Sequence, residues 1–568
     1  MNPSRFTFLS QVWTHLIRPY WTSSDRWIAL ALLGGHLVFM GAYIALTVRF
    51  NYWHNDVFTA LQELNGKVFF NLLGIFSILA FFSISVFITK FYFLQVLEIR
   101  WRKWMVHHHL DCWMKDRRYY ALQLKGNGSD NPDQRIAEDT HQFIDKTLSL
   151  TLGVFQQAIT LLSFLGILWS LSGTLHIPLG SYTLSIPGYM CWGAILYAIC
   201  GSFFSYYLGR PLIRLSYEYE KREADFRYSL VRFRENMEPI ALYEGEAQEK
   251  QIFSSRVNQI IENSYMILKR MMTINVWNNF YNQVNGVFPL LLAAPRLFAK
   301  ELTFGGLMQI LDAFRHVSHA LAFFVDNYPS IASWRATTNR LLEFKQSLEG
   351  FSPSPLTHTT HDKEEVHVVC ETISLPHGAI LNENINLIFR KGEHTIITGP
   401  TGIGKSTLAR VIAGLWTYGK GEIRLPSSSF LFLPQKPYMP LGSLKAALNY
   451  PGSGGSVKET EDVLVAVGLA PFIDRLEEVN DWARVLSLGE QQRIAIARTL
   501  LAKPQWLFLD EATSAMGEAS EAQLYRALKA ALPDTTLISV GHRESLKPLH
   551  DREIRLESGS SYWEAAVA

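Results

Sequence analysis

Two stretches of this chain, residues 27–48 and 68–89, contain no charged side chain. A helix of this length crosses the roughly 30 Å hydrocarbon core of a lipid bilayer. We therefore expect two transmembrane helices here. A cleaved signal peptide is the alternative for the first stretch, but its flanks do not suit one, because many polar and aromatic residues precede it and no small-residue cleavage site follows it.

Four further segments show a similar but weaker pattern. The first two of them are separated by a short loop, residues 172–183, that is rich in Gly, Ser and Pro. The last two are long and mostly apolar, yet they carry many polar groups. The predicted spans three to six cover residues 148–171, 186–209, 274–299 and 304–333.

Length and composition agree with a chain of two unlike parts. With 568 residues, of which 48% are apolar and 18% charged, the chain is too long for one compact core and too apolar for two soluble domains. The net charge of +2 gives no reason to expect a nucleic-acid partner. The four cysteines, Cys112, Cys191, Cys200 and Cys370, have no paired spacing, so neither a disulfide framework nor a zinc site is predicted.

Basic residues set the orientation of the spans, because they concentrate on the cytoplasmic side of membrane helices. Residues 100–146 include nine Lys or Arg, and residues 210–270 include eleven. Residues 172–183 include none. Both long loops are therefore predicted to be cytoplasmic, and six spans return the C-terminus to the same side.

The opening segment places apolar residues at helical spacing among basic residues. This pattern suits an elbow helix that lies in the membrane surface, and it also suits an ordinary buried helix face. The residues concerned are Phe6, Leu9, Val12, Trp13, Leu16, Ile17 and Tyr20.

A change of composition marks a domain boundary. From residue 350 the chain becomes rich in Ser, Pro, Thr and His, so we expect a membrane domain over residues 1–349, a linker over 350–365 and a soluble domain over 366–568. In the soluble part, short strand patterns alternate with helical ones, which favours an α/β domain with a largely parallel sheet. The strand patterns include residues 367–370, 395–398 and 506–509.

The soluble part contains a strand, a glycine-rich loop and a helix start in the order that a phosphate cradle requires, the Walker A pattern. The glycines let backbone amides face the phosphates of ATP, and the helix N-terminus favours their charge. Lys405 is expected to reach the β and γ phosphates, and the Ser406 hydroxyl to ligate Mg²⁺. The predicted ATP-binding residues are Gly399, Pro400, Thr401, Gly402, Ile403, Gly404, Lys405, Ser406 and Thr407.

Two carboxylates follow the apolar strand pattern at residues 506–509. Asp510 is expected to hold the Mg²⁺ shell, beside Ser406. Glu511 is placed to polarise the attacking water as a general base, because in-line phosphoryl transfer needs an oriented nucleophile and compensated charge.

The sequence Leu-Ser-Leu-Gly-Glu at residues 486–490 resembles the signature of the ABC transporter ATPases. Two further landmarks of that family are also in the expected order: Gln435, before the signature, matches the Q-loop, a magnesium ligand, and His542, after it, matches the switch histidine. Each alone has an ordinary structural explanation; Ser487, for example, suits a helix N-cap. The resemblance implies that the signature of one subunit closes over ATP held by the other. The residues acting in trans are then Ser487, Leu488, Gly489 and Glu490.

With one such ATPase domain and one set of six spans, the chain resembles a half transporter that works as a homodimer in the membrane. The match narrows to subfamily D of the ABC half transporters and their bacterial SbmA/BacA-like relatives, on residues 131–136, 235–246, 433–450 and the variant signature. This resemblance implies an exporter-like (type IV) α-helical membrane domain of six transmembrane helices, followed by an α/β P-loop nucleotide-binding domain. For a bacterial relative it also implies the inner membrane, with the ATPase domain in the cytoplasm.

The same resemblance implies two cytoplasmic coupling helices that pass motion of the ATPase domain to the membrane helices. A pair of merely solvated charged helices is the alternative. The residues concerned are Asn131, Pro132, Asp133, Gln134, Glu235, Glu238, Gly245 and Glu246.

The sequence departs from the family pattern at two places. The loop that coordinates the two ATP sites usually reads Ser-Ala-Leu-Asp, and here Gly517 replaces the aspartate. We expect weaker communication between the sites but preserved hydrolysis. Around Pro376 and His377, where many relatives have an aromatic residue that stacks on adenine, this chain has none.

Polar side chains recur at helical spacing on spans five and six. Because a charged group facing lipid costs about 2.5 to 3.5 kcal/mol, we expect them to face inward, either toward a wet cavity or in an interhelical pair of Asp312 with Arg315 or His316. The candidate cavity residues are Asn275, Asn278, Asn282, Asn285, Asp312, Arg315, His316 and His319.

A cavity of this kind favours a hydrophilic or amphipathic cargo, for which the family suggests cobalamin or a peptide. Two alternatives remain open at this point: a carrier of fatty acyl-CoA, and an ATP-gated channel or sensor. The direction of transport is also open.

Overall fold

The computed structural model describes residues 5–124, 131–179, 182–350, 355–452, 455–557 and 562–566. Residues 351–354 of the predicted linker, and 180–181 of the predicted loop between spans three and four, lie outside these ranges. The chain divides into two units, each described below by itself. The first comprises Met1–Asp111 and Asn131–Gln346, and the second comprises Cys112–Asp130 and Ser347–Ala568.

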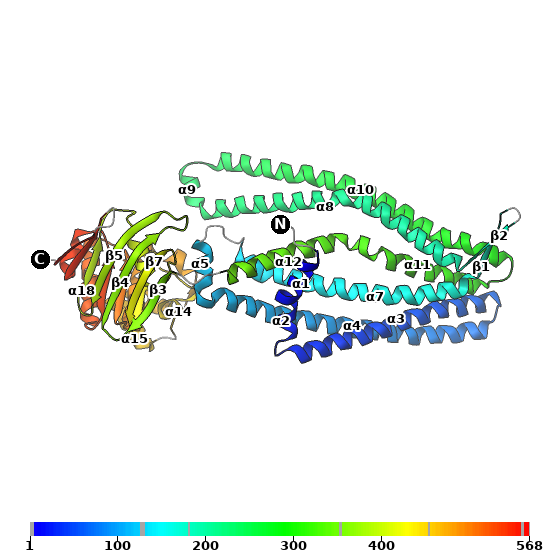
Figure 1. Ribbon diagram of the computed structural model, residues 1–568, viewed down its shortest axis with the longest axis horizontal. Coiled ribbons are helices and arrows are strands. Elements are labelled where there is room, and N and C mark those ends of the chain that lie inside the picture. The colour runs from blue at the N-terminus through cyan, green and yellow to red at the C-terminus, as the bar shows by residue number, and fades with distance from the viewer. Residues whose placement is uncertain are drawn as a thin grey trace. The chain divides into compact units, whose positions relative to one another are not determined.

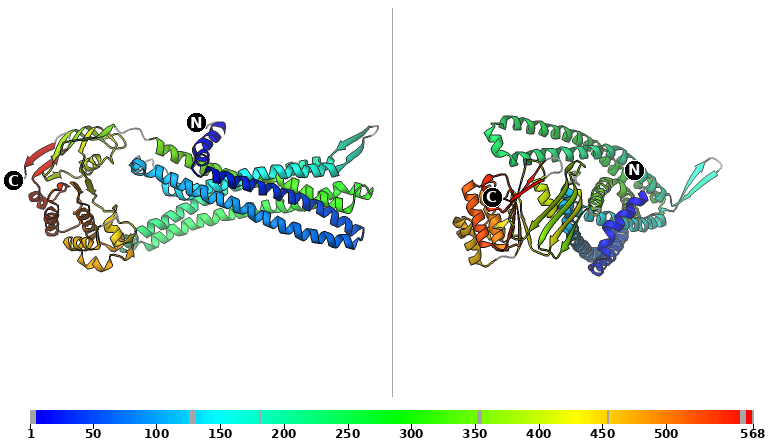
Figure 2. Two further views of the ribbon diagram at one scale, coloured as in Figure 1. Left: turned by 90° about the horizontal axis from the view of Figure 1, so that it is seen from below. Right: turned by 60° about the vertical axis from the view of Figure 1, so that its left-hand side comes forward.

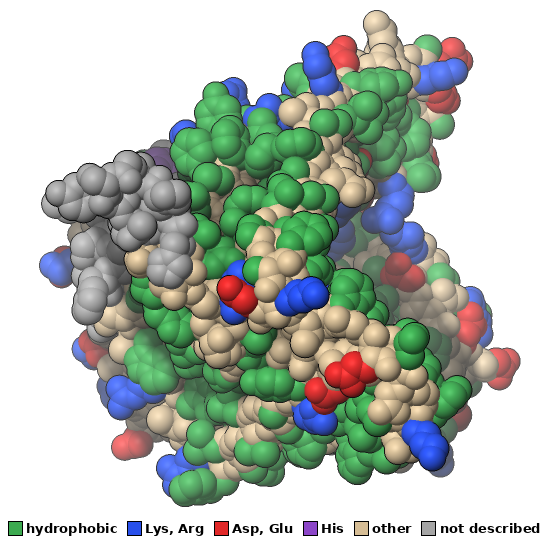
Figure 3. All heavy atoms as spheres, turned by 90° about the vertical axis from the view of Figure 1, so that its right-hand side faces the viewer, with side chains coloured by type: hydrophobic (Ala, Val, Ile, Leu, Met, Phe, Trp, Pro, Cys, Tyr) green, Lys and Arg blue, Asp and Glu red, His purple; other side chains and the backbone are tan. Residues whose placement is uncertain are grey.

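The first unit is a bundle of long helices (Figures 1 and 2). Among the described residues, four helical stretches are long and apolar enough to cross a membrane: Arg26–Gln62, Gly66–Leu124, Pro132–Ser172 and Tyr189–Glu235. The helices of the bundle are α3 (Arg26–Gln62), α4 (Gly66–Met114), α7 (Thr140–Ser172), α8 (Tyr189–Glu235), α10 (Glu246–Phe298), α11 (Phe304–Asp326) and α12 (Tyr328–Glu349). Figure 3 looks onto one end of this bundle, where hydrophobic side chains cover much of the visible face.

Three expectations about the bundle need correction. The predicted loop at 172–183 is part of a β-hairpin, in which β1 (Thr174–Leu179) pairs antiparallel with β2 (Tyr182–Pro187). The fourth span consequently begins at Tyr189 rather than at residue 186. The sixth predicted span is interrupted at Asn327, between α11 and α12, because Pro329 in the first turn of α12 has no N–H to continue the hydrogen bonds of α11.

The opening segment forms α1 (Arg5–Val12), a π-helical turn (Trp13–Ile17) and α2 (Arg18–Trp21). One face is buried in the bundle: Val12, Leu16 and Tyr20 pack with Trp101 in a common core. Leu9 and Trp13 are 58% and 55% exposed. Of Phe6 only the backbone is described. One side of the segment is therefore an ordinary buried helix face, which was the alternative to an elbow helix. The other side carries exposed apolar residues.

The second unit is built on a six-stranded sheet with strand order β14-β13-β6-β12-β11-β8. All neighbouring strands run parallel except β14, which pairs antiparallel with β13. Buried apolar runs such as Trp506–Asp510 suit a parallel sheet covered on both faces. The strands are β6 (Thr395–Thr398), β8 (Phe430–Leu433), β11 (Trp506–Asp510), β12 (Thr536–Val540), β13 (Arg552–Leu556) and β14 (Tyr562–Ala566).

A separate four-stranded sheet, of order β3-β7-β4-β5, covers the first and is mostly antiparallel. The predicted strand 367–370 belongs to this second sheet, so the expectation of one largely parallel sheet was wrong for that segment. Its alternating burial marks a sheet with one face on the core. The strands are β3 (Leu356–His361), β4 (Glu365–Ser374), β5 (Ile380–Arg390) and β7 (Gly419–Pro426).

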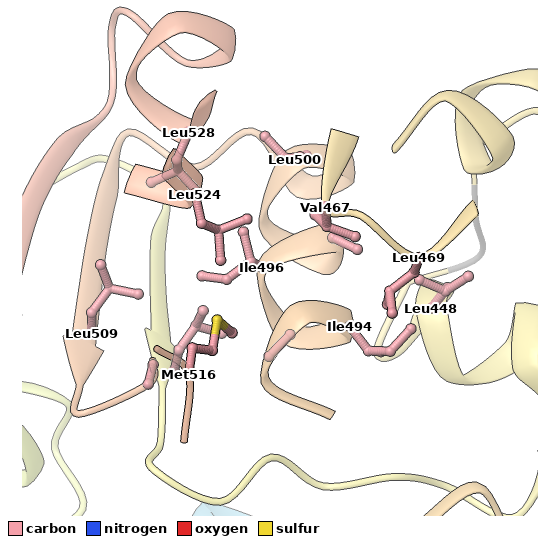
Figure 4. Close-up of a cluster of buried hydrophobic side chains, with 14 of the residues drawn as sticks. Leu448, Val467, Leu469, Ile494, Ile496, Leu500, Leu509, Met516, Leu524 and Leu528 are labelled. Atoms are coloured by element: carbon pink, nitrogen blue, oxygen red, sulfur yellow. The ribbon is translucent and has the colours of Figure 1, made fainter. Parts of the chain in front are cut away.

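Helices complete the second unit around two cores. One core lies between the two sheets and includes Leu408 and Ile412 of α13. The other surrounds α17, whose Ile496 points toward Leu524 of α18, while Ile494 points to the opposite side, toward Leu448 and Leu469 (Figure 4). The helices are α5 (Arg118–Leu124), α13 (Lys405–Ile412), α14 (Leu444–Asn449), α15 (Val457–Ala466), α16 (Trp482–Val485), α17 (Leu488–Ala502) and α18 (Glu518–Ala531).

Candidate functional site

The glycine-rich loop connects β6 to α13 in a conformation that needs its glycines. Gly399, Gly402 and Gly404 have φ values of 138°, 84° and 101°. A Cβ on Gly399 would lie 2.5 Å from the carbonyl oxygen of Leu556, and one on Gly404 would lie 2.6 Å from Oδ1 of Asn382. No other residue type fits both the dihedral angles and the space. The loop can therefore present backbone amides to an anion at the N-terminus of α13.

Lys405 begins α13 and is only 6% exposed. Its Nζ donates to the carbonyl oxygens of Gly399, at 2.9 Å, and Pro400, at 2.8 Å. Burial lowers the pKa of Lys405, and the nearby carboxylates of Glu511 and Asp510 oppose that shift. A phosphate that binds this ammonium group competes with the two loop carbonyls.

The next residue of α13 meets the end of β11. Ser406 Oγ donates to Asp510 Oδ1 at 2.8 Å. Burial raises the pKa of Asp510, and the hydrogen bond from Ser406 opposes the shift. This donor set of a hydroxyl and a carboxylate oxygen fits Mg²⁺, which prefers oxygen ligands.

Glu511 is the centre of a second group of contacts. One carboxylate oxygen accepts from Gln435 Nε2 at 3.0 Å, and the other lies 3.1 Å from His542 Nε2. The strand order explains this convergence, because Gln435 follows β8, Glu511 follows β11 and His542 follows β12. All three thus leave the same carboxyl edge of the parallel sheet, the edge at which such sheets bind ligands.

The signature residues lie at the N-terminus of α17. Ser487 is its N-cap and forms a capping box with Glu490, in which Ser487 Oγ donates to the Glu490 carboxylate at 2.8 Å and accepts from the Glu490 N–H. Leu488 is exposed, and Gly489 lies between it and Glu490. The structural explanation for Ser487 therefore holds, and it is compatible with binding an anion at the same helix end.

The loop that carries Gly517 leads into α18. Gly517 is the N-cap of this helix, with φ −69° and ψ 148°, and no side chain caps the helix end. A Cβ at this position meets no atom within 4 Å. Pro376 and His377 lie in an exposed turn between β4 and β5.

Two residues of this site escaped the sequence analysis. Gln492 on α17 bonds both the loop after β8 and the loop after β11. Arg543 donates to the carbonyl oxygens of Ser514 and Met516 and pairs with the buried carboxylate of Glu521. Arg543 directly follows the switch histidine, and Gln492 lies two residues after the signature. This closeness in sequence is the signal that could have pointed to these two residues.

In the helical unit, the candidate cavity residues come together between α3, α10 and α11. A cavity of about 580 Å³ is lined by polar residues of these helices and by Phe58, Gly286, Met308 and Leu311. The polar lining residues are His54, Asn282, Asn285, Asp312, Arg315 and His319. A smaller adjoining pocket includes Asn278, Ser318 and Asp326.

Two of the predicted cavity residues line neither pocket. His316 stacks on Phe164, with 4.1 Å between ring centroids. Asn275 uses its backbone carbonyl to accept from the side chain of Asn279. His54 of α3 was missed, because nothing in its local sequence relates it to α11.

Asp312 is the most connected group of the cavity, and its side chain is 11% exposed. Arg315 Nη2 lies 2.5 Å from one oxygen, and Asn51 Nδ2 donates to the other at 2.9 Å. The nitrogens of His54 and His316 lie 3.9 and 3.8 Å from the carboxylate. The expected interhelical pair with Arg315 or His316 is corrected: both share α11 with Asp312, and the contacts between helices come from Asn51 and His54 of α3.

The residues assigned to coupling lie in the helical unit. Asn131 has a left-handed backbone before α6 (Pro132–Gln134), which contains Asp133. Glu235 ends α8, Glu238 lies in α9 (Met237–Leu242), and Gly245 precedes Glu246 at the start of α10. The preceding helix α5 belongs instead to the second unit, where Arg117 donates to the carbonyl oxygen of Ala413 at 2.7 Å.

Comparison with known proteins matches both units. Residues 16–298 match the family model "ABC transporter transmembrane region 2", and residues 382–514 match "ABC transporter". The chain is 33% identical to the inner membrane ABC transporter ATP-binding protein YddA of Escherichia coli, over 94% of this chain and 95% of the relative. It is 31% identical to the chloroplastic ABC transporter D family member 2 of Arabidopsis thaliana, over 98% and 88%.

Two more distant proteins are also similar. The lysosomal cobalamin transporter ABCD4 of Mus musculus is 28% identical, over 83% of this chain and 82% of that protein. The structure of a bacterial Atm1-family ABC exporter with ATP bound superposes with a TM-score of 0.73 at 16% identity, over 95% of this chain and 96% of the other. This last likeness shows the fold, which is that of the type IV exporters.

Proposed function

This chain belongs to the ABC transporters, as a half transporter of the subfamily D group whose ATPase domain drives transport, and we propose that it carries a hydrophilic or amphipathic compound across the bacterial inner membrane. The observation that carries this proposal is the polar cavity around Asp312. In this proposal the molecule is a homodimer with its ATPase domains in the cytoplasm. The inner-membrane relative YddA supports the location.

The chemistry of the cavity favours a polar cargo over a free acyl chain. Charged and amide groups are costly in a membrane interior unless they face water, each other or a polar ligand. Oδ1 of Asn285 and the hydroxyl of Ser318, which is 3% exposed, are buried and find no hydrogen-bond partner among the described residues. Buried polar groups are almost always paired, so these two indicate where water or cargo binds.

Cobalamin and peptides are the cargoes that we consider first. The similarity to the lysosomal cobalamin transporter supports the former, and the amide groups of Asn278, Asn282 and Asn285 suit a cargo that both donates and accepts hydrogen bonds. Phe58, Met308 and Leu311 add an apolar part to the lining, which suits an amphipathic molecule. A carrier of fatty acyl-CoA remains the alternative.

At the ATP site, we propose that the residues from Gly399 to Thr407 hold the phosphates and that Lys405 neutralises the β and γ groups. Ser406, Asp510 and Gln435 are the proposed magnesium ligands, and the ion would compensate phosphate charge. Glu511 orients the attacking water and accepts its proton, while His542 fixes the position of the Glu511 carboxylate. The signature around Ser487 and Gly489 of a second copy completes each site.

Reconstitution into proteoliposomes tests the cargo. We expect cobalamin or short peptides to stimulate ATP hydrolysis by the wild-type protein and acyl-CoA to leave the rate unchanged. Asn282→Ala should remove most of the stimulation, because Asn282 lines both pockets. The matched control is Asn275→Ala on the same helix, which removes the same group outside the pockets and should respond like the wild type.

Stimulation by acyl-CoA but not by cobalamin or peptides would overturn the proposed cargo class. An ATP-gated channel would instead show ionic conductance that persists when hydrolysis is blocked. Uptake of labelled cargo by whole cells, with and without the gene, then gives the direction of transport.

A further inference from the structure

Gln492 lies in the middle of the ATPase domain, and its side chain bonds the loops beside Glu511 rather than Glu511 itself. It is on α17, five residues after the signature serine Ser487, and its exposed fraction is 0%. The same helix buries Ile494 and Ile496 on two opposite sides in one hydrophobic core (Figure 4). A polar side chain at such a position must satisfy its hydrogen bonds within the protein.

The amide of Gln492 joins two loops that do not otherwise belong to α17. Its Nε2 donates to the backbone carbonyl oxygen of Gln435 at 3.0 Å and lies 3.4 Å from Ser514 Oγ. Its Oε1 accepts from the backbone N–H of Ala515 at 3.0 Å. The donor half of the amide therefore holds the loop after β8 and makes a longer contact with Ser514, and the acceptor half holds the loop after β11.

These contacts close a ring around Glu511. The side chain of Gln435 donates to Glu511, and Glu511 is paired with His542. Arg543, the next residue, donates to the carbonyl oxygens of Ser514 and Met516 on either side of Ala515. These contacts lead back to Gln492. Its amide is therefore placed to fix the positions of both loops, that of Gln435 and that of Ala515, around the Glu511 carboxylate.

We propose that Gln492 is a positioning residue for ATP hydrolysis: its amide ties the signature helix to both the Gln435–Glu511 contact and the loop of Ser514 to Gly517. This loop lacks the aspartate expected of its family, because Gly517 has no side chain. The tie through Gln492 is therefore the route by which engagement of the signature reaches Glu511 within one chain. The proposal rests on the proposed role of Glu511 as the general base.

Substitutions can distinguish the role of the amide N–H donor from that of the amide oxygen. Gln492→Glu keeps an oxygen that accepts from Ala515 but places a second oxygen against the carbonyl of Gln435, so it breaks only the tie to the loop after β8. Gln492→Met has a similar shape and breaks both ties. Thr499→Val on the same helix is the control for stability, because Thr499 is equally buried and its hydroxyl donates within α17, to the carbonyl oxygen of Ala495.

The full-length protein in proteoliposomes is measured for kcat, KM for ATP, affinity for a fluorescent ATP analogue, and thermal unfolding. In both Gln492 variants we expect kcat to fall at least about 10-fold while affinity for the analogue stays within about twofold, because the phosphate contacts of Lys405 and Ser406 are untouched. Thr499→Val should lower the unfolding temperature without this selective loss of kcat.

Unchanged kcat in Gln492→Glu, or a loss of kcat in all three variants that simply follows their unfolding temperatures, overturns the proposal. If Glu511→Gln itself retains turnover, the assignment of the general base fails first. If Glu511→Gln is inactive while Gln492→Glu is fully active, only the role of Gln492 fails. Should Gln492→Met not fold, Gln492→Glu alone decides, since it keeps the bond to Ala515.

Discussion

Glu511 has an unusual backbone for a residue that is not glycine. Its φ of 48° lies in the left-handed region, and its N–H donates to the carbonyl oxygen of Val540 on the neighbouring strand. Such a conformation costs on the order of 1 to 3 kcal/mol and is concentrated at functional sites. Here it turns the side chain out of the line of β11 to a point between Gln435 and His542.

Replacement of Glu511 by Gln tests its chemistry with little change of shape. We expect Glu511→Gln to bind ATP and to hold the two ATPase domains together, while hydrolysis falls by at least about 100-fold, because the amide cannot accept a proton from water. The measurements are ATP turnover and binding of radiolabelled ATP. Turnover close to that of the wild type contradicts the assignment.

At Gly517, a substitution can restore the aspartate that the family usually has, rather than remove a functional group. Its φ of −69° suits any residue and a Cβ has open space, so Gly517→Asp should be accommodated. An aspartate is also a good N-cap for α18, although it improves on glycine by only a few tenths of a kcal/mol. We expect a nearly unchanged unfolding temperature and a higher Hill coefficient for ATP, measured by steady-state hydrolysis. Gly517→Ala is the control that adds a Cβ without the carboxylate.

At this scale the sequence predicts candidate residues but not the contacts that they make. Lys405, Asp510, Glu511 and His542 are recognisable because each stands at a fixed offset in a local pattern. Contacts such as that of Asn51 with Asp312 join residues that are 261 positions apart. Only the packing of helices brings such pairs together, and no local pattern encodes it.

At the scale of elements, helices were easier to predict than the connections between them. The first two spans follow from the absence of charge. The hairpin of β1 and β2 was missed because Gly, Ser and Pro are also typical of irregular loops. The break at Asn327 was missed because the span was assigned from its overall apolar content, although Asp326, Asn327 and Pro329 interrupt the apolar pattern. Strand 367–370 was assigned to the wrong kind of sheet because a short run does not show whether its neighbours are parallel.

A buried polar chain links α18 to β12 and to the short helical turn, Glu544–Leu549, that precedes β13. Tyr525 on α18 donates to Ser539 Oγ, Ser539 in turn can donate to His550 Nε2, and His550 Nδ1 lies 2.8 Å from the carbonyl oxygen of Leu546. The chain is fully satisfied with a neutral imidazole. Burial, together with the nearby charge of Lys529, lowers the pKa of His550 to about 4, although the carbonyl of Leu546 opposes the shift.

This histidine predicts acid sensitivity. Because its pKa is lower in the folded than in the unfolded state, its contribution to stability is complete above about pH 6.5 and is lost as the pH falls toward 4. The loss is on the order of 3 kcal/mol at about 1.4 kcal/mol per pH unit. Thermal unfolding of the solubilised protein should decline less steeply between pH 6.5 and 5 in His550→Gln than in the wild type. His377→Gln, at an exposed position, should decline like the wild type.

At the scale of the whole molecule, the proposed homodimer has two composite ATP sites. A chain with Lys405→Ala lacks a working phosphate cradle, and a chain with Ser487→Arg lacks a working signature. A mixed dimer of the two retains one intact site. Since the absence of an aspartate at 517 favours independent sites, we expect mixed dimers isolated with two affinity tags to hydrolyse ATP at about half the wild-type rate.

The control for this experiment pairs Lys405→Ala with Glu511→Gln. Both changes then lie in the cradles, no intact site remains, and the mixed dimer should be inactive. If the first mixed dimer is also inactive, the two sites fire only together, and the loss of the aspartate has not uncoupled them.

The second unit includes a segment that is distant in sequence from the rest of it. Leu124 of α5 packs against the core between the two sheets, and Arg117 caps the carbonyl oxygen of Ala413 just after α13. A chimera that joins this membrane domain to the ATPase domain of a relative at residue 350 would therefore separate that core from its covering helix. Exchange of ATPase domains between such transporters should therefore succeed only when residues 112–124 are exchanged together with the ATPase domain. The part of this protein that can be exchanged is thus made of two separate segments of the chain.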